Sequence, residues 1–255
     1  MAGKFQGKRV LVTGGGTGIG REVAVAFLQQ GARVVICGRR HGPLKEAVQS
    51  QQPAFPDFHY VECDISDPAD VAELRDKVRQ LLGGLDVLVN NAGVSERGNI
   101  ESTTLKVWDR VMNVNLRGTF LVTQAVLPLL KEAGRGANVL NISSNLGRQA
   151  EQHQLVYAAS KAGLDMFTRC CALDYAEEGI RFNTISPGVI DTPMQDSNKG
   201  ELGYQEWRSQ MEQLHPLRAI GLPKDVAAAA LFLCSADADW LTGVNLPVDG
   251  GMCAR

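Results

Sequence analysis

Short apolar runs rich in β-branched residues alternate along this sequence with longer segments in which apolar residues recur every three or four positions. This order is typical of repeated strand–helix–strand units with parallel strands, and the nearly unbroken apolar runs favour strands covered by helices on both faces. Strands are predicted at Arg9–Thr13, Arg33–Cys37, His59–Cys63, Val87–Asn90, Asn138–Ser143, Arg181–Ser186 and Val244–Val248. Helices are predicted near 18–30, 43–52, 67–82, 103–131, 156–177 and 224–234.

The chain has 255 residues, without an internal repeat, a low-complexity tract or a linker. We therefore expect one α/β domain over residues 1–255, with a central seven-stranded parallel sheet. One stretch, 193–222, breaks the rhythm, because it is long and polar where a helix–strand connection is ordinarily short. A long insertion at the carboxyl edge of a sheet favours a substrate lid.

The charge and cysteine patterns exclude several classes of protein. A formal net charge of −2 gives no field for nucleic acid or an acidic membrane, and Arg39-Arg40 is the only dense basic spot. No apolar run approaches the ~20 residues of a membrane helix or resembles a signal peptide. The six cysteines form no CxxC motif, which favours a reducing compartment. We expect a cytoplasmic protein without a metal site, nucleic-acid partner or membrane partner.

A glycine-rich turn, TGGGTGIG at 13–20, directly follows the first predicted strand and opens the first helix. Glycines let backbone N–H groups approach a phosphate, and a helix N-terminus favours negative charge. Because the flanking strand and helix are also present, the turn predicts a doubly wound, Rossmann-type fold that binds a dinucleotide.

The end of the second predicted strand indicates which dinucleotide. NAD-binding proteins place an acidic residue there to hold the ribose 2′-hydroxyl. Here the strand ends in the letters CGRR at 37–40, without an acid. A guanidinium group would hold a 2′-phosphate bidentately. The sequence therefore predicts NADP(H), with Arg39 as the favoured contact.

Tyr157 and Lys161 lie four residues apart at the start of a predicted helix, which places them on one face. A phenol titrates near pH 10, but an ammonium group about 5 Å away would lower its pKa by about two units. Tyr157 would then serve as a general acid/base near neutral pH. Ser144, at the end of an earlier strand, is placed to hold a substrate oxygen against the phenol.

Taken together, these motifs resemble the short-chain dehydrogenase/reductase family over essentially the whole chain. The matching segments are TGGGTGIG (13–20), CDI (63–65), NNAG (90–93), NVN (113–115), SS (143–144), YAASK (157–161), PGVIDT (187–192) and VDGG (248–251). One residue departs from the arginine-bearing pattern of NADP-using members, because Thr17 stands where a second arginine sometimes occurs. Secondary use of NAD(H) therefore stays open.

The resemblance implies that Asn115, Ser144, Tyr157 and Lys161 form a catalytic tetrad. Tyr157 would transfer the alcohol proton, Ser144 would polarise the carbonyl, and Lys161 would lower the phenol pKa and hold the nicotinamide ribose. Asn115 would kink its helix and bind a water that relays protons. With the glycine turn and the arginines, the implied cofactor site comprises Gly14, Gly16, Thr17, Gly18, Ile19, Gly20, Arg39, Arg40, Asp64, Ile65, Asn91, Ala92, Gly93, Tyr157, Lys161, Pro187, Gly188, Ile190 and Thr192.

The predicted activity is hydride transfer between NADP(H) and a carbonyl or secondary alcohol of a small or medium molecule. Expected substrate contacts are Ser144, Asn145, His153, Tyr157 and Met194. A 3-oxoacyl-carrier-protein reductase is an alternative that would need a basic patch at the entrance, and a non-catalytic dinucleotide sensor is another. The resemblance also implies a homo-oligomer, either a tetramer or a dimer.

Overall fold

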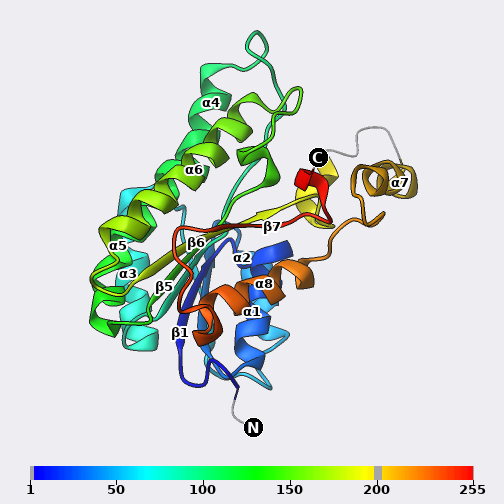
Figure 1. The fold of residues 1–255 in the computed structure, drawn as a ribbon. Coiled ribbons are helices and arrows are strands. Elements are labelled where there is room, and N and C mark those ends of the chain that lie inside the picture. Colours follow the sequence, from blue (N-terminus) through cyan, green and yellow to red (C-terminus); the bar gives the residue numbers. More distant parts are fainter. Residues whose placement is uncertain (1–2, 198–202, 255) are drawn as a thin grey trace.

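In the computed structural model, which describes residues 3–197 and 203–254, the strands form one parallel sheet (Figure 1). The strand order is β3-β2-β1-β4-β5-β6-β7. The strands are β1 (Arg9–Thr13), β2 (Arg33–Gly38), β3 (Phe58–Glu62), β4 (Val87–Asn90), β5 (Asn138–Ile142), β6 (Arg181–Pro187) and β7 (Asn245–Val248). Every strand predicted from the sequence is confirmed, with its ends within one residue of the prediction.

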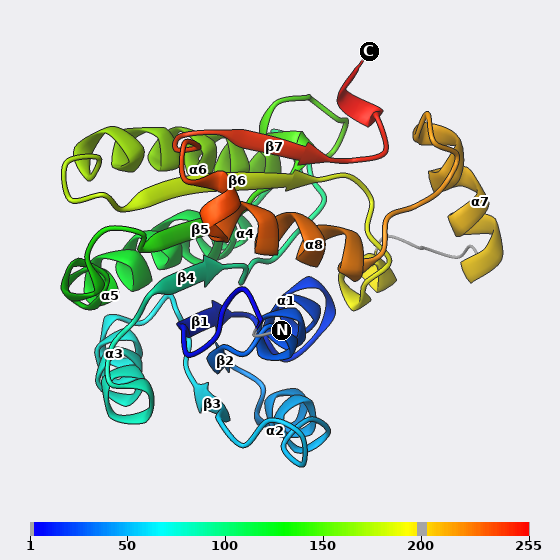
Figure 2. The ribbon, with the colours of Figure 1, turned by 60° about the horizontal axis from the view of Figure 1, so that its bottom comes forward.

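Helices cover both faces of this sheet (Figure 2). One face carries α1 (Gly18–Gln29), α2 (His41–Gln49) and α8 (Pro223–Cys234); the other carries α3 (Pro68–Leu82), α4 (Leu105–Met112), α5 (Thr119–Ala133) and α6 (Leu155–Asp174). Alternate strand residues supply two separate cores, since Val10 and Val12 pack with α1 while Leu11 between them packs with α3. The predicted doubly wound α/β fold is confirmed.

The helix predicted at 103–131 consists of three consecutive parts. Between α4 and α5 lies η1 (Asn113–Gly118), a π-helical segment with a wider turn. Gly118, the last residue of the segment, packs against Ile65. A Cβ added at Gly118 would lie only 2.9 Å from the Ile65 Cδ1, so this position has no room for a side chain. The kink expected at Asn115 therefore takes the form of a π-helix.

The segment predicted as a lid contains a helix that the sequence prediction missed. It holds η3 (Pro193–Ser197) and α7 (Tyr204–Leu214), and Ile190 bridges Gly221 just beyond α7. Trp207 is the buried anchor of α7. The remaining short helices are η2 (Asn145–Gly147), η4 (Ala236–Ala238) and η5 (Met252–Ala254). Within the described ranges, no helix combines the length and apolar character required to cross a membrane.

Candidate active site

A groove runs along the carboxyl edge of the sheet, where the strand order reverses between β1 and β4. It consists of a larger outer cavity and a smaller inner cavity. The two cavities share the lining residues Ile19, Asn91, Gly93, Thr192 and Met194. A long ligand can therefore lie continuously from the end of β2 to Tyr157.

The glycine turn forms one wall of the outer cavity because side chains would not fit there. Gly14 has φ +65°, and an added Cβ would lie 2.9 Å from the Ala92 Cα; Gly18 has φ +54° and faces Thr192. Thr17 precedes α1 without capping its first turn through a side chain. The N–H end of α1 therefore faces a cavity of the kind that accepts a phosphate.

Thr13 and Asn91 brace the turn against β4. The Thr13 hydroxyl accepts hydrogen bonds from the Asn91 and Ala92 backbone N–H groups, each at 3.0 Å. The Asn91 side chain donates from Nδ2 to the Thr13 carbonyl at 3.0 Å and to the Gly14 carbonyl at 3.2 Å. Asn91 thus holds the glycine turn against the end of β4, and it also lines both cavities.

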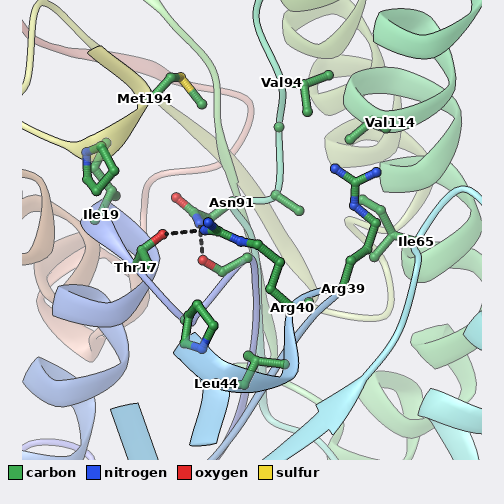
Figure 3. Close-up of a pocket in the computed structure, with 18 of the residues that line it drawn as sticks. Thr17, Ile19, Arg39, Arg40, Leu44, Ile65, Asn91, Val94, Val114 and Met194 are labelled. Atoms are coloured by element: carbon green, nitrogen blue, oxygen red, sulfur yellow. Dashed lines mark hydrogen bonds between the residues drawn. The ribbon is translucent and has the colours of Figure 1, made fainter. Parts of the chain in front are cut away.

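The two arginines after β2 extend into different parts of the outer cavity (Figure 3). Arg40 reaches across the glycine turn and donates to the Thr17 hydroxyl at 3.4 Å, whereas Arg39 extends toward Ile65 and Val114. Arg39 lies 3.9 Å from the Asp64 carboxylate, and its side chain is 51% exposed. Burial acts to raise the pKa of Asp64, but hydrogen bonds from Ser66 and the charge of Arg39 lower it overall. This end of the groove therefore combines two cations with an acid that stays ionised.

The inner cavity holds Ser144, Tyr157 and Lys161. Ser144 follows β5, and its hydroxyl accepts a hydrogen bond from the Leu146 N–H group at 3.2 Å. The Lys161 Nζ donates to the Ile142 carbonyl at 2.8 Å and lies 5.6 Å from the centre of the Tyr157 ring. The predicted phenol–ammonium pair thus occupies one face of α6, at the inner end of the groove.

Ionisation of this pair departs from the sequence prediction. Desolvation raises the pKa of Tyr157, and a hydrogen bond with Ser144 lowers it only in part. Burial also lowers the pKa of Lys161 to about 8. The phenol pKa is therefore raised in this structure and not lowered as the sequence predicted, because desolvation of the buried phenol is the largest effect on it.

Asn115 lies beside the cavities rather than in their lining. Its Oδ1 accepts from the Val94 N–H group at 2.8 Å, and its Nδ2 donates to the Val94 carbonyl at 2.9 Å and the Ser160 hydroxyl at 3.0 Å. Ser160 donates in turn to the Tyr157 carbonyl at 2.7 Å. Asn115 therefore joins the π-helical segment to the start of α6.

Most of the predicted site residues are brought together along the groove. The outer cavity is lined by Gly14, Gly16, Thr17, Gly18, Ile19, Arg39, Arg40, Asp64, Ile65, Asn91, Ala92, Gly93, Thr192 and Met194, and the inner one adds Ser144, Tyr157, Lys161, Pro187, Gly188 and Ile190. Four predicted residues are not in either lining, namely Gly20, Asn115, Asn145 and His153. Gly20 packs against Asn91, Asn145 is buried beside Met252, and His153 is exposed at φ +62°.

Several lining residues were not predicted, chiefly Pro43, Leu44, Cys63, Val94, Val114, Ser143, Pro193 and Gln195. Val94 and Pro193 each adjoin a motif used in the prediction, and Val114 lies inside the NVN motif. A rule that takes every residue of a motif and one residue on either side would have found all three. Leu44 had no such signal, because an apolar residue in the first turns of a helix ordinarily belongs to the core.

The comparisons with known proteins agree with this geometry. A family model described as enoyl-(acyl carrier protein) reductase matches residues 14–253. An uncharacterized oxidoreductase of Bacillus subtilis, YxbG, is 37% identical over 99% of this chain and 93% of its own length. The NADP-dependent (R)-specific alcohol dehydrogenase of Lentilactobacillus kefiri is 34% identical over the full length of both chains.

A solved structure of an actinorhodin polyketide ketoreductase variant with NADPH shares 30% identity and a TM-score of 0.93, with all of both chains covered. The similarity therefore extends over the glycine turn, the groove and the phenol–ammonium pair alike. On the evidence of its sheet, its motifs and these relatives, the chain belongs to the short-chain dehydrogenase/reductase family of oxidoreductases.

Proposed function

We propose that this protein transfers a hydride between NADP(H) and a carbonyl or secondary alcohol of a small or medium molecule, with Tyr157 as the general acid/base. The observation that carries the proposal is the continuous groove, in which Ser144, Tyr157 and Lys161 lie at the inner end and two arginines lie at the outer end. The NADP-dependent relative and the ketoreductase structure with NADPH support this choice of cofactor and reaction.

A bound nicotinamide would supply the hydride, and the protein would supply position and charge compensation. Ser144 and Tyr157 would donate hydrogen bonds to the substrate oxygen, where negative charge develops during reduction. The raised pKa of Tyr157 keeps the phenol protonated near neutral pH, which suits an acid that gives its proton to a nascent alkoxide. For alcohol oxidation the phenolate is needed, and the positive charges of Lys161 and an oxidised nicotinamide favour it.

The residues around the groove fit the cofactor in two respects. The glycine turn leaves backbone N–H groups accessible for the diphosphate, and Arg39 and Arg40 supply charge for a 2′-phosphate. Asn115 would hold its proposed proton-relaying water near Ser160, Ile190 would contact the nicotinamide carboxamide, and Thr192 would contact the cofactor phosphate or amide. Secondary use of NAD(H) belongs to the same proposal, because Thr17 provides no second charge inside the turn.

The proposal includes a substrate lid at 193–222. Tyr204 at the start of α7 donates to the Asp191 carboxylate at 2.5 Å, and Arg208 donates to the Tyr204 hydroxyl at 3.1 Å. Asp191 adjoins Thr192, which lines both cavities. Movement of α7 would therefore be transmitted directly to the groove.

Tyr157→Phe tests the acid/base role. General acid–base catalysis contributes about 10²–10⁴-fold, so kcat/KM for ketone reduction should fall by at least about 100-fold while the NADPH Kd changes little. Tyr175→Phe is the matched control, because Tyr175 stacks on Phe182 away from the groove. A panel of ketones, sugars and acyl thioesters provides the substrates. Near wild-type turnover by Tyr157→Phe would contradict the proposal.

Arg39→Ala and Arg40→Ala test the cofactor choice. Loss of one charge-assisted hydrogen bond to a phosphate costs about 1.5–3 kcal/mol, so the KM for NADPH should rise about 10–100-fold while that for NADH stays unchanged. Arg75→Ala on α3 is the control, since Arg75 pairs with its exposed neighbour Asp76. Equal effects on both cofactors would remove the arginine concerned from the 2′-phosphate site.

A further inference from the structure

Asp165 is a buried acid of α6 with no role in the site described so far. It is only 5% exposed, and it lies one helical turn beyond Lys161 and two turns beyond Tyr157. Residues spaced by four share a face of a helix, so the phenol, the ammonium group and this carboxylate follow one another along α6. A carboxylate is almost never buried to this degree unless it is paired.

The Asp165 carboxylate meets two other elements. Its Oδ2 accepts a hydrogen bond from the Asn245 Nδ2 at 2.8 Å, at the first residue of β7. The same oxygen lies 2.7 Å from the position that a Cβ on Gly147 would occupy. Gly147 ends η2, the short helix that Ser144 caps. Asp165 thus contacts the loop that carries the predicted carbonyl-polarising hydroxyl.

The charged groups around Asp165 come from two elements. Lys161 and Arg169 lie on α6, and Arg148 follows η2; Ser143 and Asn245 are neutral neighbours from the β5 end and from β7. Lys161 is the buried one of these cations, at 4% exposure. Its Nζ donates to a neutral carbonyl, that of Ile142, so Asp165 supplies the opposing charge.

The effects on ionisation agree with this arrangement. Burial lowers the pKa of Lys161 to about 8, and Asp165 acts in the opposite direction. Burial raises the pKa of Asp165, while the Ser143 hydroxyl and the charge of Lys161 oppose the rise. Each of the two charges therefore favours the charged form of the other, against the effect of burial.

An asparagine at 165 would accept the same hydrogen bond from Asn245 and occupy the same volume. What the carboxylate supplies at this position, and an amide would not, is a negative charge. We propose that Asp165 is a positioning residue of the active site, which holds the Lys161 ammonium in its charged form beside Tyr157 and fixes the loop that carries Ser144. The catalytic consequence rests on the proposed function. The ionisation of Lys161 does not, and it is measurable without turnover.

The first test is an NMR titration of Lys161 in protein labelled with ¹³C at the lysine Cε, with Lys161→Met to assign the signal. Wild-type Lys161 should titrate near 8, well below the ~10.4 of surface lysines. In Asp165→Asn the midpoint should fall by about one further pH unit, because a unit charge within about 10 Å is lost. Asn245→Ala, which removes the hydrogen bond and keeps the carboxylate, is the matched control and should leave the midpoint unchanged.

The second test is the pH profile of kcat/KM for ketone reduction. Since a neighbouring carboxylate raises the pKa of an ammonium group, its removal should move the alkaline limb of the profile to lower pH in Asp165→Asn but not in Asn245→Ala. The double variant Asp165→Asn/Asn245→Asp returns the charge to the far side of the same hydrogen bond. It should move the limb part of the way back, and it remains informative if the single variant folds poorly.

An unchanged Lys161 midpoint in folded Asp165→Asn would overturn the proposal. So would equal loss of kcat in Asp165→Asn and Asn245→Ala with identical pH profiles, because that result describes a purely structural role. If the wild type reduces no carbonyl compound, the proposed function fails, while the NMR titration still decides the ionisation of Lys161.

Discussion

Gly20→Ala probes how tightly the glycine turn is packed against β4. Gly20 lies in the first turn of α1, outside the groove lining. A Cβ at this position would stand 2.4 Å from the Asn91 Nδ2 and 2.5 Å from the Gly14 carbonyl oxygen. In proteins a Cβ atom essentially never lies closer than 3.0 Å to a heavy atom to which it is not bonded, so either Asn91 or the glycine turn must move.

The cost follows from the hydrogen bonds that would break. A shift of the Asn91 side chain by about 1 Å takes its bonds to the Thr13 and Gly14 carbonyls beyond bonding distance, and each contributes about 1 kcal/mol. Residual overpacking against the Gly14 backbone adds about 1–3 kcal/mol, while the better helix propensity of alanine returns up to about 1 kcal/mol. We therefore expect the free energy of unfolding to fall by about 3 kcal/mol, which corresponds to about 6–12 °C in Tm for a chain of this size.

Thermal unfolding by circular dichroism, together with NADPH binding, measures the effect. Gly42→Ala is the matched control, because Gly42 lies in the first turn of α2 with no atom within 4 Å of an added Cβ. That variant should be unchanged or more stable by up to about 1 kcal/mol. If Gly20→Ala unfolds within about 2 °C of the wild type and binds NADPH normally, the packing argument is refuted.

Two further substitutions test hydrogen bonds at the two edges of the sheet, Asp86 at the amino edge and His215 beside the groove. Asp86→Asn should lower the free energy of unfolding by about 1–2 kcal/mol, since Asp86 accepts from the Arg9 Nε at 2.7 Å and backbone N–H at 2.9 Å. Burial acts to raise the pKa of Asp86, but its bonds to Arg9 lower it overall. The stability that Asp86 contributes is therefore present above the unfolded pKa of about 3.9 and is lost as pH falls through the lower folded pKa. In urea unfolding between pH 3 and 7, the free energy of unfolding should therefore decrease less with falling pH in the variant than in the wild type. His215→Phe should cost about 2 kcal/mol or more in urea unfolding and raise the KM for the cofactor, because the buried His215 ring bonds the Val189 N–H group at 3.2 Å and the Met211 carbonyl at 2.8 Å. An unchanged KM would show that Val189 holds its place without the ring.

The sheet was predictable because its signals are local. Each strand is a short β-branched run bounded by turn residues, and the order of elements specifies parallel pairing. Helix α7 was missed because only Trp207, Met211 and Leu214 form its apolar stripe, within an otherwise polar segment. Their spacing of four and three is a helical signal, but three residues are too few to outweigh the polar composition.

The candidate site was predictable in its members but not in its energetics. Motifs place Ser144, Tyr157 and Lys161 together because one strand end and one helix face converge at the sheet edge. The pKa values of Tyr157 and Lys161 depend on desolvation, which is a property of the whole packed environment and has no local signal. Asp165 was overlooked for the same reason, since nothing in a sequence marks an acid as buried.

The π-helical segment at Asn113–Gly118 makes this stretch intolerant of length changes. Before this segment α4 packs on α6, and after it α5 packs on α3. The wide turn therefore determines how the packing face of α4 is rotated about the helix axis relative to the packing face of α5. Deleting or inserting one residue in the regular helix on either side of the wide turn would rotate one half by about 100° relative to the other. Either α4 would leave α6, or Asn115 would lose Val94 and Ser160. Homologues that differ in length between β4 and α5 should therefore carry their insertions and deletions before α4 and keep this stretch at constant length.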